Sequence, residues 1–377
     1  MVYLDNSATS YPKPKSVYHM YKNAIKYYYS NPGRGGYENA LLCAEKIYET
    51  RKKIADFFGE SNEENVVFTA NCTAAVNLVM KGLLKSGDHV LISDLEHNAV
   101  LRCVDKLRRE SGIKYDIFQT DFYDDEKTLQ SVKKLVQPNT KLIFCTHASN
   151  VLGVCLPIAK IGAFCYRHGI TFAVDAAQSG GILPLNMAKM HIDFLCLAPH
   201  KGLFAPMGTG IFIGDGTKLN TLIEGGTGSH SVSRLQPDFM PDKLEAGTMN
   251  TGGILAIGAG IDFIRHYGRE TVFHRDKQHI LHLFDGLQQV KNCVLYLDYR
   301  KLGTFSPAIS FNLKNIPSEI VAENLAQKHI FVRAGLHCAP LAHQKIGTID
   351  SGTVRLSPSF FTKDKDINYT INTIKKL

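Results

Sequence analysis

The stretch FAVDAAQS, residues 172–179, decides the fold of this chain of 377 residues. It opens with a short apolar run that ends at the carboxylate of Asp175, and such a run, closed by small and polar residues, is typical of a strand buried inside a sheet. The helical stretch AKIGAFCYRHG, residues 159–169, separates it from another β-rich run, KLIFCTHA, residues 141–148. Two short strands joined by a helix predict a βαβ unit with parallel strands.

The same alternation extends from about residue 65 to residue 213. Working outward, the β-rich and helical runs are NVVFTA, TAAVNLVMKGLL, HVLISD, KYDIFQT, TLQSVKKLV, DFLCLA and TGIFIG. We therefore expect an α/β fold whose mostly parallel sheet lies between helices. Ligands bind at the carboxyl ends of the strands in such sheets, which is where His97, Asn150, Asp175 and Lys201 are placed.

The pattern changes near residue 251. Two long helical stretches are followed by AISFNL, a helix near residues 318–328, the strands IFVRAG and TVRLS, and a final helix. This order predicts a second, smaller α+β domain at the C-terminus, with a boundary near Gly252 and Gly253.

Composition excludes several classes of protein. Hydrophobic residues make up 44% and charged residues 21%, which excludes a disordered chain. The longest apolar run, residues 252–264, is too short to span a bilayer and contains Asp262, so we expect a cytoplasmic protein that contacts no membrane. The +8 net charge is dispersed, which argues against nucleic acid as a partner. The nine cysteines form no CxxC pair, so we expect neither a disulfide framework nor a metal site.

Two strand-end residues are candidates for chemistry. Lys201 follows an apolar strand in LCLAPHKGLFAPMGTG, where partial desolvation favours a nucleophilic amine suited to a Schiff base. A solvated surface lysine is the alternative. Asp175 can pair with a protonated pyridine nitrogen, or it can simply cap a turn.

Three further residues are weaker candidates. Thr73 lies between a strand and a helix, where a hydroxyl and free N–H groups suit a phosphate, or where a threonine caps its own helix. His97, in LEHNAV, is either structural or functional. Arg355, in TVRLS, can bind a substrate carboxylate or form an ordinary cross-strand ion pair. An anion-binding turn, a strand-end Asp and a strand-end Lys in one α/β domain are together the parts needed to hold pyridoxal phosphate.

The chain resembles the class V branch of fold-type I pyridoxal-phosphate enzymes, and within it the cysteine desulfurases and selenocysteine lyases. The resemblance extends nearly end to end, through YLDNSATS, NPGRGG, NCTAAVNL, LEHNAV, THASNVLG, VDAAQS, PHKG, LEAGTMN, VRAGLHCAP and VRLSPSFF. It implies an N-terminal segment, residues 1–20, that packs with the small domain. It also implies a large cofactor-binding domain, residues 21–251, and a small domain, residues 252–377, that carries the catalytic cysteine.

The resemblance also implies residue roles. Lys201 would form the Schiff base with pyridoxal phosphate, and the other cofactor contacts would come from Asp175, Gln178, His97, Asn150, Thr73, Cys72 and His200. Thr248 matches a residue that reaches the phosphate of the neighbouring subunit, which implies a homodimer. Arg355 would bind the substrate carboxylate, with Asn150 and Arg34 near the substrate.

Cys338, in VRAGLHCAP, matches the family's catalytic cysteine, which takes sulfur from L-cysteine as a persulfide and passes it to an acceptor. The short spacing to Arg355 resembles the subgroup with a short, ordered cysteine loop. Such a thiol must be exposed and readily ionised, and His337 or Arg333 is placed to favour the thiolate. The alternative is a buried structural cysteine.

The sequence departs from the family at three positions. Ala198 stands where a Ser or Thr usually binds the phosphate, Cys72 stands in the phosphate turn, and GTMN replaces the commoner GTPN. The loss of one hydrogen bond to a charged phosphate would cost roughly 1.5–3 kcal/mol of cofactor affinity.

We therefore predict a cysteine desulfurase that releases L-alanine and supplies sulfur, for example for iron–sulfur cluster assembly. A selenocysteine lyase and a class V aminotransferase or epimerase are the enzymatic alternatives. A non-catalytic cofactor binder or sulfur-relay partner is less consistent with the presence of both Lys201 and Asp175.

Overall fold

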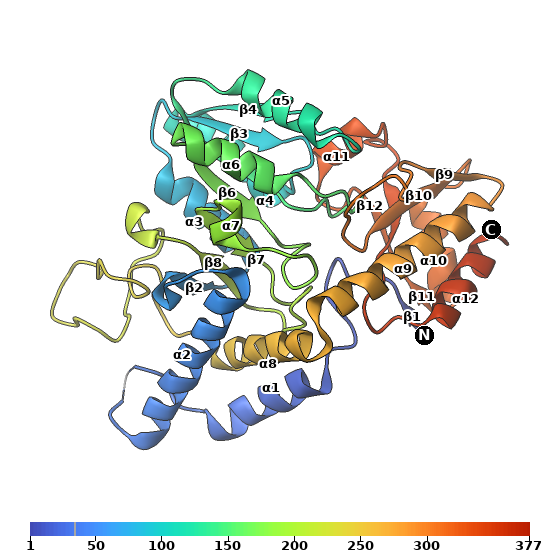
Figure 1. Cartoon of the computed structure of the whole chain (residues 1–377). Helices are drawn as coiled ribbons and strands as arrows, with labels where there is room; N and C mark the ends of the chain where they lie inside the picture. Colours follow the sequence, from blue (N-terminus) through green and yellow to red (C-terminus); the bar gives the residue numbers. More distant parts are fainter. Residues whose placement is uncertain (34) are drawn as a thin grey trace.

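The computed structural model describes residues 1–33 and 35–377, so Arg34, which was predicted to lie near the substrate, is outside the described residues. A large central sheet with helices on both faces occupies one side of the molecule, and a smaller sheet with its own helices occupies the other (Figure 1). The predicted α/β architecture with a mostly parallel sheet is confirmed. Within the described residues, no helix combines the length and apolar character needed to cross a bilayer.

The large sheet has seven strands in the order β2-β8-β7-β6-β5-β3-β4. From β7 to β4 all neighbours are parallel, whereas β8 is antiparallel to both β7 and β2. The strands are β2 (Val66–Thr69), β3 (His89–Ser93), β4 (Lys114–Phe118), β5 (Thr140–Thr146), β6 (Thr171–Asp175), β7 (Phe194–Leu197) and β8 (Gly210–Ile213).

Side chains from the two faces of this sheet enter two separate hydrophobic cores. In β5, Leu142 and Phe144 join one core, and Ile143 and Cys145 join the other. Because successive side chains of a strand point to opposite faces, a strand buried on both sides has to be apolar throughout. This is why the strands appear in the sequence as continuous apolar runs.

Helices cover both faces of the large sheet, with α3 and α4 packed together on one face and α5, α6 and α7 on the other. The helices up to α8 are α1 (Lys15–Tyr27), α2 (Glu38–Phe58), α3 (Cys72–Leu83), α4 (Asn98–Ser111), α5 (Asp125–Leu135), α6 (Ile158–His168), α7 (Met187–Met190) and α8 (Thr251–Tyr267). Two 3-10 helices, η1 (Glu63–Asn65) and η2 (Gly216–Lys218), precede β2 and follow β8.

The smaller sheet is antiparallel, with strand order β12-β13-β10-β9. Its strands are β9 (Cys293–Leu295), β10 (Ile309–Leu313), β12 (Arg333–Gly335) and β13 (Thr353–Leu356), and the helices of this region are α9 (Arg269–Gln288), α10 (Ser318–Gln327), α11 (Pro340–Lys345) and α12 (Asp364–Ile374). The predicted single strand IFVRAG is wrong in one respect. The chain changes sheets at Val332, because β11 (Ile330–Phe331) pairs with β1 while β12 pairs with β13.

The first residues of the chain pack beside the smaller sheet. Strand β1 (Val2–Tyr3) pairs in parallel with β11, and Asp5 forms an isolated bridge with Ser357. Helix α8 instead packs on α1 and α2, beside the large sheet, while α9 packs on α12 and β9. The division of the chain at residue 252 stays a proposal, and the packing of α8 favours a boundary between α8 and α9.

A buried carboxyl group ties together the carboxyl ends of β3 and β5. Glu96 Oε1 accepts hydrogen bonds from the hydroxyl of Ser93 and, at 2.8 Å, from the backbone N–H of Thr146. Its other oxygen, Oε2, is buried without a hydrogen-bond partner among the described residues. Burial raises the pKa of Glu96 from 4.5 to about 8, so the group is a neutral acid in the folded protein near neutral pH.

We predict that Glu96→Gln stabilises the protein relative to wild type as the pH rises from 5 to 8. In this window the unfolded chain has lost the Glu96 proton and the folded chain retains it, so wild-type stability falls by at most about 1.4 kcal/mol per pH unit from this group. Urea unfolding of both proteins at several pH values measures the difference, with exposed Glu110→Gln as the control. A stability difference that does not change with pH would contradict the prediction.

Candidate active site at the carboxyl ends of the large sheet

A pocket of about 130 Å³ opens at the carboxyl ends of the parallel strands. It brings together nine of the residues singled out in the sequence, which lie on five separate stretches of the chain: Cys72, Thr73, His97, Asn150, Asp175, Gln178, Ala198, His200 and Lys201. The structure therefore places these nine residues around one pocket, while the role of each one remains a prediction.

Asp175 is the buried acid of the pocket and ends strand β6. Its Oδ1 accepts a hydrogen bond from the backbone N–H of Ala177 at 2.8 Å and from the thiol of Cys72 at 3.7 Å. Its Oδ2 has no hydrogen bond within the described chain, which leaves one carboxylate oxygen for a ligand. Cys72 therefore lies beside Asp175, and its expected place at a phosphate stays a prediction.

Lys201 lies in the tight loop that follows β7. The loop is closed by the backbone hydrogen bond from the N–H of Lys201 to Ala198 O at 3.1 Å and continues directly to Leu203. Helix α8 packs against Leu203 so closely that a Cβ at Gly260 would lie 1.9 Å from its carbonyl oxygen. Burial lowers the pKa of Lys201, and the charge of Asp175 only partly opposes this effect. A desolvated amine of this kind can act as a nucleophile and as a base.

Two histidines of the pocket are held as neutral rings. His97 is the N-cap of α4, and its Nδ1 accepts a hydrogen bond from the backbone N–H of Ala99 at 3.0 Å. Burial lowers the pKa of His97, and burial together with Lys201 lowers that of His200 to about 4. Nδ1 of His200 is buried and has no partner among the described residues. A buried ring nitrogen without a partner is typical of a site that a ligand completes.

The N-terminus of α3 forms another wall of the pocket. Asn71 caps this helix by accepting from the N–H of Ala74 at 2.9 Å, and Thr73 is exposed beside it. A helix N-terminus with a hydroxyl suits a phosphate group. Gln178 lies opposite and donates through Nε2 to Ser7 O at 3.0 Å.

This donor set fits pyridoxal phosphate. It offers an amine for the aldehyde, a carboxylate for the pyridine nitrogen, and a helix N-terminus with the free His200 nitrogen for the phosphate. Ala198, which lines the same pocket, supplies no hydroxyl. The unpartnered His200 nitrogen is a donor or acceptor that can compensate for the missing hydroxyl.

Cys338 is exposed, whereas five of the other eight cysteines are buried. Its loop is fixed to the large sheet, because Cys338 O accepts from the N–H of Asn98 at 2.7 Å and His337 O accepts from Asn150 Nδ2 at 2.6 Å. Both His337 and Cys338 adopt the left-handed backbone conformation, with φ of 48° and 59°. Non-glycine residues rarely adopt this conformation, and such strain is concentrated at functional sites.

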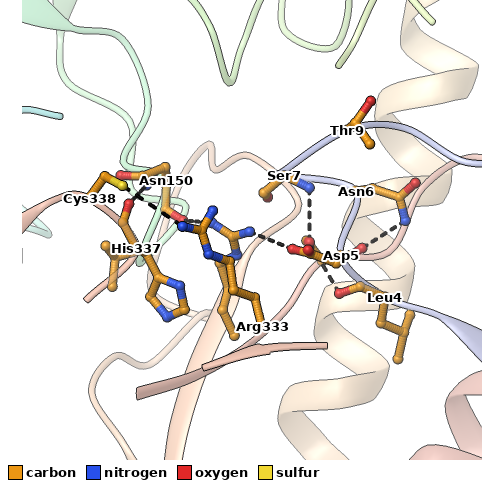
Figure 2. Close-up of polar contacts among 12 residues, drawn as sticks. Leu4, Asp5, Asn6, Ser7, Thr9, Asn150, Arg333, His337 and Cys338 are labelled. Carbon is orange, nitrogen blue, oxygen red and sulfur yellow. Dashed lines mark hydrogen bonds and ion pairs between the residues drawn. The ribbon is translucent and has the colours of Figure 1, made fainter. Parts of the chain in front are cut away.

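Of the two residues expected to favour the Cys338 thiolate, Arg333 and His337, only Arg333 places a charge beside the sulfur. Arg333 Nη2 lies 3.8 Å from Cys338 Sγ (Figure 2). The expectation that His337 favours the thiolate is wrong, because its ring points away to Thr353, with Nε2 3.1 Å from Thr353 O. Burial lowers the pKa of His337 to about 2, so the ring carries no charge.

Arg355 is almost completely buried and forms an ion pair that the sequence did not reveal. Its Nη2 lies 2.6 Å from Asp5 Oδ1 and its Nη1 donates to Asn150 O at 2.9 Å. Its Nε is buried without a partner among the described residues. Figure 2 shows Asp5 on one side of this site and Cys338 with Asn150 on the other. The cross-strand neighbours of Arg355 are Arg333 on β12 and Ser310 on β10, so the ion pair with Asp5 is not the cross-strand pair considered from the sequence.

One predicted site residue lies elsewhere. Thr248 is exposed and lines a larger hollow of about 690 Å³ between α3 and the segment that precedes α8. Sequence reasoning also missed two contributors to the site, namely Asp5 and the ion pair between Asp94 and Lys345 at 2.5 Å. That ion pair holds α11, which follows Cys338, against the end of β3. The lone acid in YLDNSATS was the available signal for Asp5.

Comparisons with known proteins agree with this geometry. A curated relative from Methanothermobacter thermautotrophicus, described as a probable cysteine desulfurase, is 31% identical over all of this chain and 94% of its own length. A probable cysteine desulfurase from Pyrococcus abyssi is 29% identical with the same coverage. A solved apo structure of a cysteine desulfurase from Thermococcus onnurineus is 30% identical and superposes with a TM-score of 0.91, over 100% of this chain and 94% of that one.

The family model for class-V aminotransferases matches residues 2–369. This match includes every segment that lines the pocket, together with the loop that carries Cys338 and the ion pair between Arg355 and Asp5. The chain therefore belongs to the aminotransferase class-V family.

Proposed function

We propose that this chain is a pyridoxal-phosphate-dependent cysteine desulfurase that converts L-cysteine to L-alanine and leaves a persulfide on Cys338. One observation carries the proposal. The backbone carbonyls of Cys338 and His337 accept hydrogen bonds from Asn98 and Asn150, which holds the loop of the exposed Cys338 against Asn150, a residue that lines the pocket with Lys201 and Asp175. An incidental cysteine would not need two backbone anchors and a left-handed conformation.

The residues of the pocket would have different roles in binding the cofactor and in moving protons. When bound, pyridoxal phosphate supplies an electron sink for the carbon from which a proton is removed. Lys201 and Asp175 would hold it, with His97 over the ring and Gln178 at the ring oxygen, as the family resemblance implies. Lys201 has the lowered pKa that a base needs to take and return the Cα proton.

Arg355 is the candidate for the substrate carboxylate. Its guanidinium retains a buried, unpartnered Nε after it has bound Asp5 and Asn150 O. A carboxylate on that nitrogen would place the substrate beside Asn150, whose side chain already holds the cysteine loop. Arg34, by resemblance alone, would lie near the substrate.

Sulfur transfer balances without an external oxidant or reductant. The Cys338 sulfur forms a bond to the substrate sulfur as the Cβ–S bond breaks. The electron pair of the broken bond goes to the carbon, which takes a proton to become the methyl group of alanine. Cys338 is left with a new S–S bond, as a persulfide. An acceptor thiol or protein can then take the outer sulfur, for example in iron–sulfur cluster assembly.

A homodimer is the second part of the proposal. The hollow that contains Thr248 is also lined by the apolar side chains of Leu222 and Ile223, and Val232 and Leu235 are exposed on the same segment. A surface of this kind favours coverage by a second copy. Thr248 would then reach the phosphate of the partner's site. The nine free cysteines support a cytoplasmic, reducing location.

We predict that Cys338→Ala lowers the release of alanine and sulfide from L-cysteine by roughly two orders of magnitude or more. The variant should still act on L-selenocysteine, because selenium leaves carbon more easily than sulfur. Alanine and sulfide are measured with added pyridoxal phosphate and a reducing thiol. The matched control is Cys293→Ala, and Lys201→Ala should lose both activities. Full L-cysteine activity in Cys338→Ala would overturn the proposal.

We also predict that Arg333→Ala slows alkylation of Cys338 by iodoacetamide at pH 7 by a few-fold, because it removes the only cation seen within hydrogen-bonding reach of the sulfur in the described structure. Mass spectrometry of the Cys338 peptide follows the rate. Arg333→Lys should restore part of it, and Arg300→Ala should have no effect. Unchanged alkylation in Arg333→Ala would show that the guanidinium does not act on this thiol.

The dimer is tested by Ile223→Glu, with Ile320→Glu on α10 as the control. A buried glutamate at the proposed interface should yield monomers in light scattering. In the monomer, Thr248 can no longer contact the cofactor phosphate of a partner subunit. Cofactor affinity should therefore fall by about 10- to 100-fold, as expected for the loss of one hydrogen bond to a charged group. A variant that remains dimeric would place the interface elsewhere.

A further inference from the structure

A second cavity, of about 20 Å³, adjoins the pocket, because Lys201 and Gln178 line both. Its wall also includes Ser7 and Ser10 of the N-terminal segment. A site for one water molecule needs roughly 10–15 Å³ and two to four polar partners. This cavity is large enough and polar enough to meet both conditions.

Asp276 of α9 also lines this cavity, and no step described above uses it. Its side chain is 3% exposed, and its Oδ1 is buried without a hydrogen-bond partner among the described residues. Burial raises the pKa of Asp276 well above its ordinary value, although Arg275 opposes the effect. A neutral carboxyl group can both donate and accept a hydrogen bond, and a buried one without a partner calls for a bound water.

The N-terminal segment, whose Ser7 and Ser10 line the cavity together with Asp276, is tied to the Lys201 loop. The N–H and the hydroxyl of Ser10 each donate to His200 O at 3.1 Å, and Gln178 Nε2 donates to Ser7 O. These hydrogen bonds join the two serines to the loop of Lys201 and to Gln178, whereas Asp276 Oδ1, on the same cavity, has no partner among the described residues. A water in the cavity would connect Asp276 to this hydrogen-bonded segment.

We propose that this cavity binds an ordered water molecule that links Asp276 to Lys201 and passes protons between them. This inference rests on the proposed function, because desulfuration is the reaction that needs the proton. Each desulfuration places one new proton on Cβ, and the Cys338 thiol gives up one proton to solvent when it ionises. One proton must therefore enter the pocket in each turnover. Asp276 donates it through the water to the Lys201 amine and regains a proton from solvent.

Exchange of the Cα hydrogen of L-alanine in D₂O, followed by NMR with the holoenzyme, tests this link without involving Cys338. Asp276→Asn keeps the shape of the side chain but carries protons poorly, and Asp276→Leu removes the polar partner of the water. Both should slow the exchange by about tenfold or more. Asp285→Asn, near the C-terminal end of the same helix, where the side chain pairs with Arg300 and lies outside both cavities, is the matched control and should exchange like wild type.

Two further measurements separate a relay from a structural role. The apo form of Asp276→Asn should unfold at a temperature no lower than wild type, since the amide keeps the shape of the side chain and can still hydrogen-bond to the water. A high-resolution structure of the wild-type holoenzyme should show water hydrogen-bonded to Asp276.

Wild-type exchange rates in Asp276→Asn, or a dry cavity in the wild-type structure, would overturn the relay. If Asp276→Asn does not fold or bind pyridoxal phosphate, the wild-type structure alone decides. A wild-type enzyme that exchanges the alanine hydrogen without desulfurating L-cysteine would refute the proposed function and leave the relay in place.

Discussion

The buried guanidinium of Arg355 is the interaction on which the rest of the site depends. It lies on a strand of the smaller sheet, contacts the N-terminal segment through Asp5, and contacts the loop after β5 through Asn150 O. A buried cation is costly unless it is paired and hydrogen-bonded, so these three parts of the chain have to come together around it. The same contacts position Asn150, which in turn holds the loop of Cys338.

The charges around the pocket favour an anionic ligand. Burial lowers the pKa values of His97, His200 and His337, so these rings add no charge. The charged groups that remain are the acids Asp5 and Asp175 and the basic residues Lys201, Arg333 and Arg355, so basic groups outnumber acids by one when Lys201 is protonated. In a poorly solvated site this excess attracts phosphate and carboxylate groups, and both are present in a cofactor-bound amino acid.

The thiol of Cys338 is held by the fold instead of being carried on a free loop. Its backbone is bound to the first residue of α4, and α11 immediately after it is fixed by the ion pair between Lys345 and Asp94. A short loop anchored on both sides loses little conformational entropy when the thiol reacts. It also has limited reach, so an acceptor has to approach the surface at which Cys338 is exposed.

The sequence by itself determined the layered α/β architecture and most of the pocket. Strands buried on both faces must be continuously apolar, as in residues 142–145 and 172–174, and polar residues directly after such strands must meet at one edge of a parallel sheet. Asp175, Lys201 and His97 could therefore be placed from local pattern alone. The family resemblance added the role of Cys338 and favoured a substrate role for Arg355 over the ion pair that its strand position equally allowed.

Only the tertiary structure decided which partners these side chains have. The pairing of Arg355 with Asp5 joins residues 350 positions apart, and the change of sheet at Val332 depends on where β1 lies. The orientation of His337 away from Cys338, and its loss of charge, follow from burial against Thr353. Such contacts depend on burial and on long-range packing, which residue type and spacing along the chain do not encode.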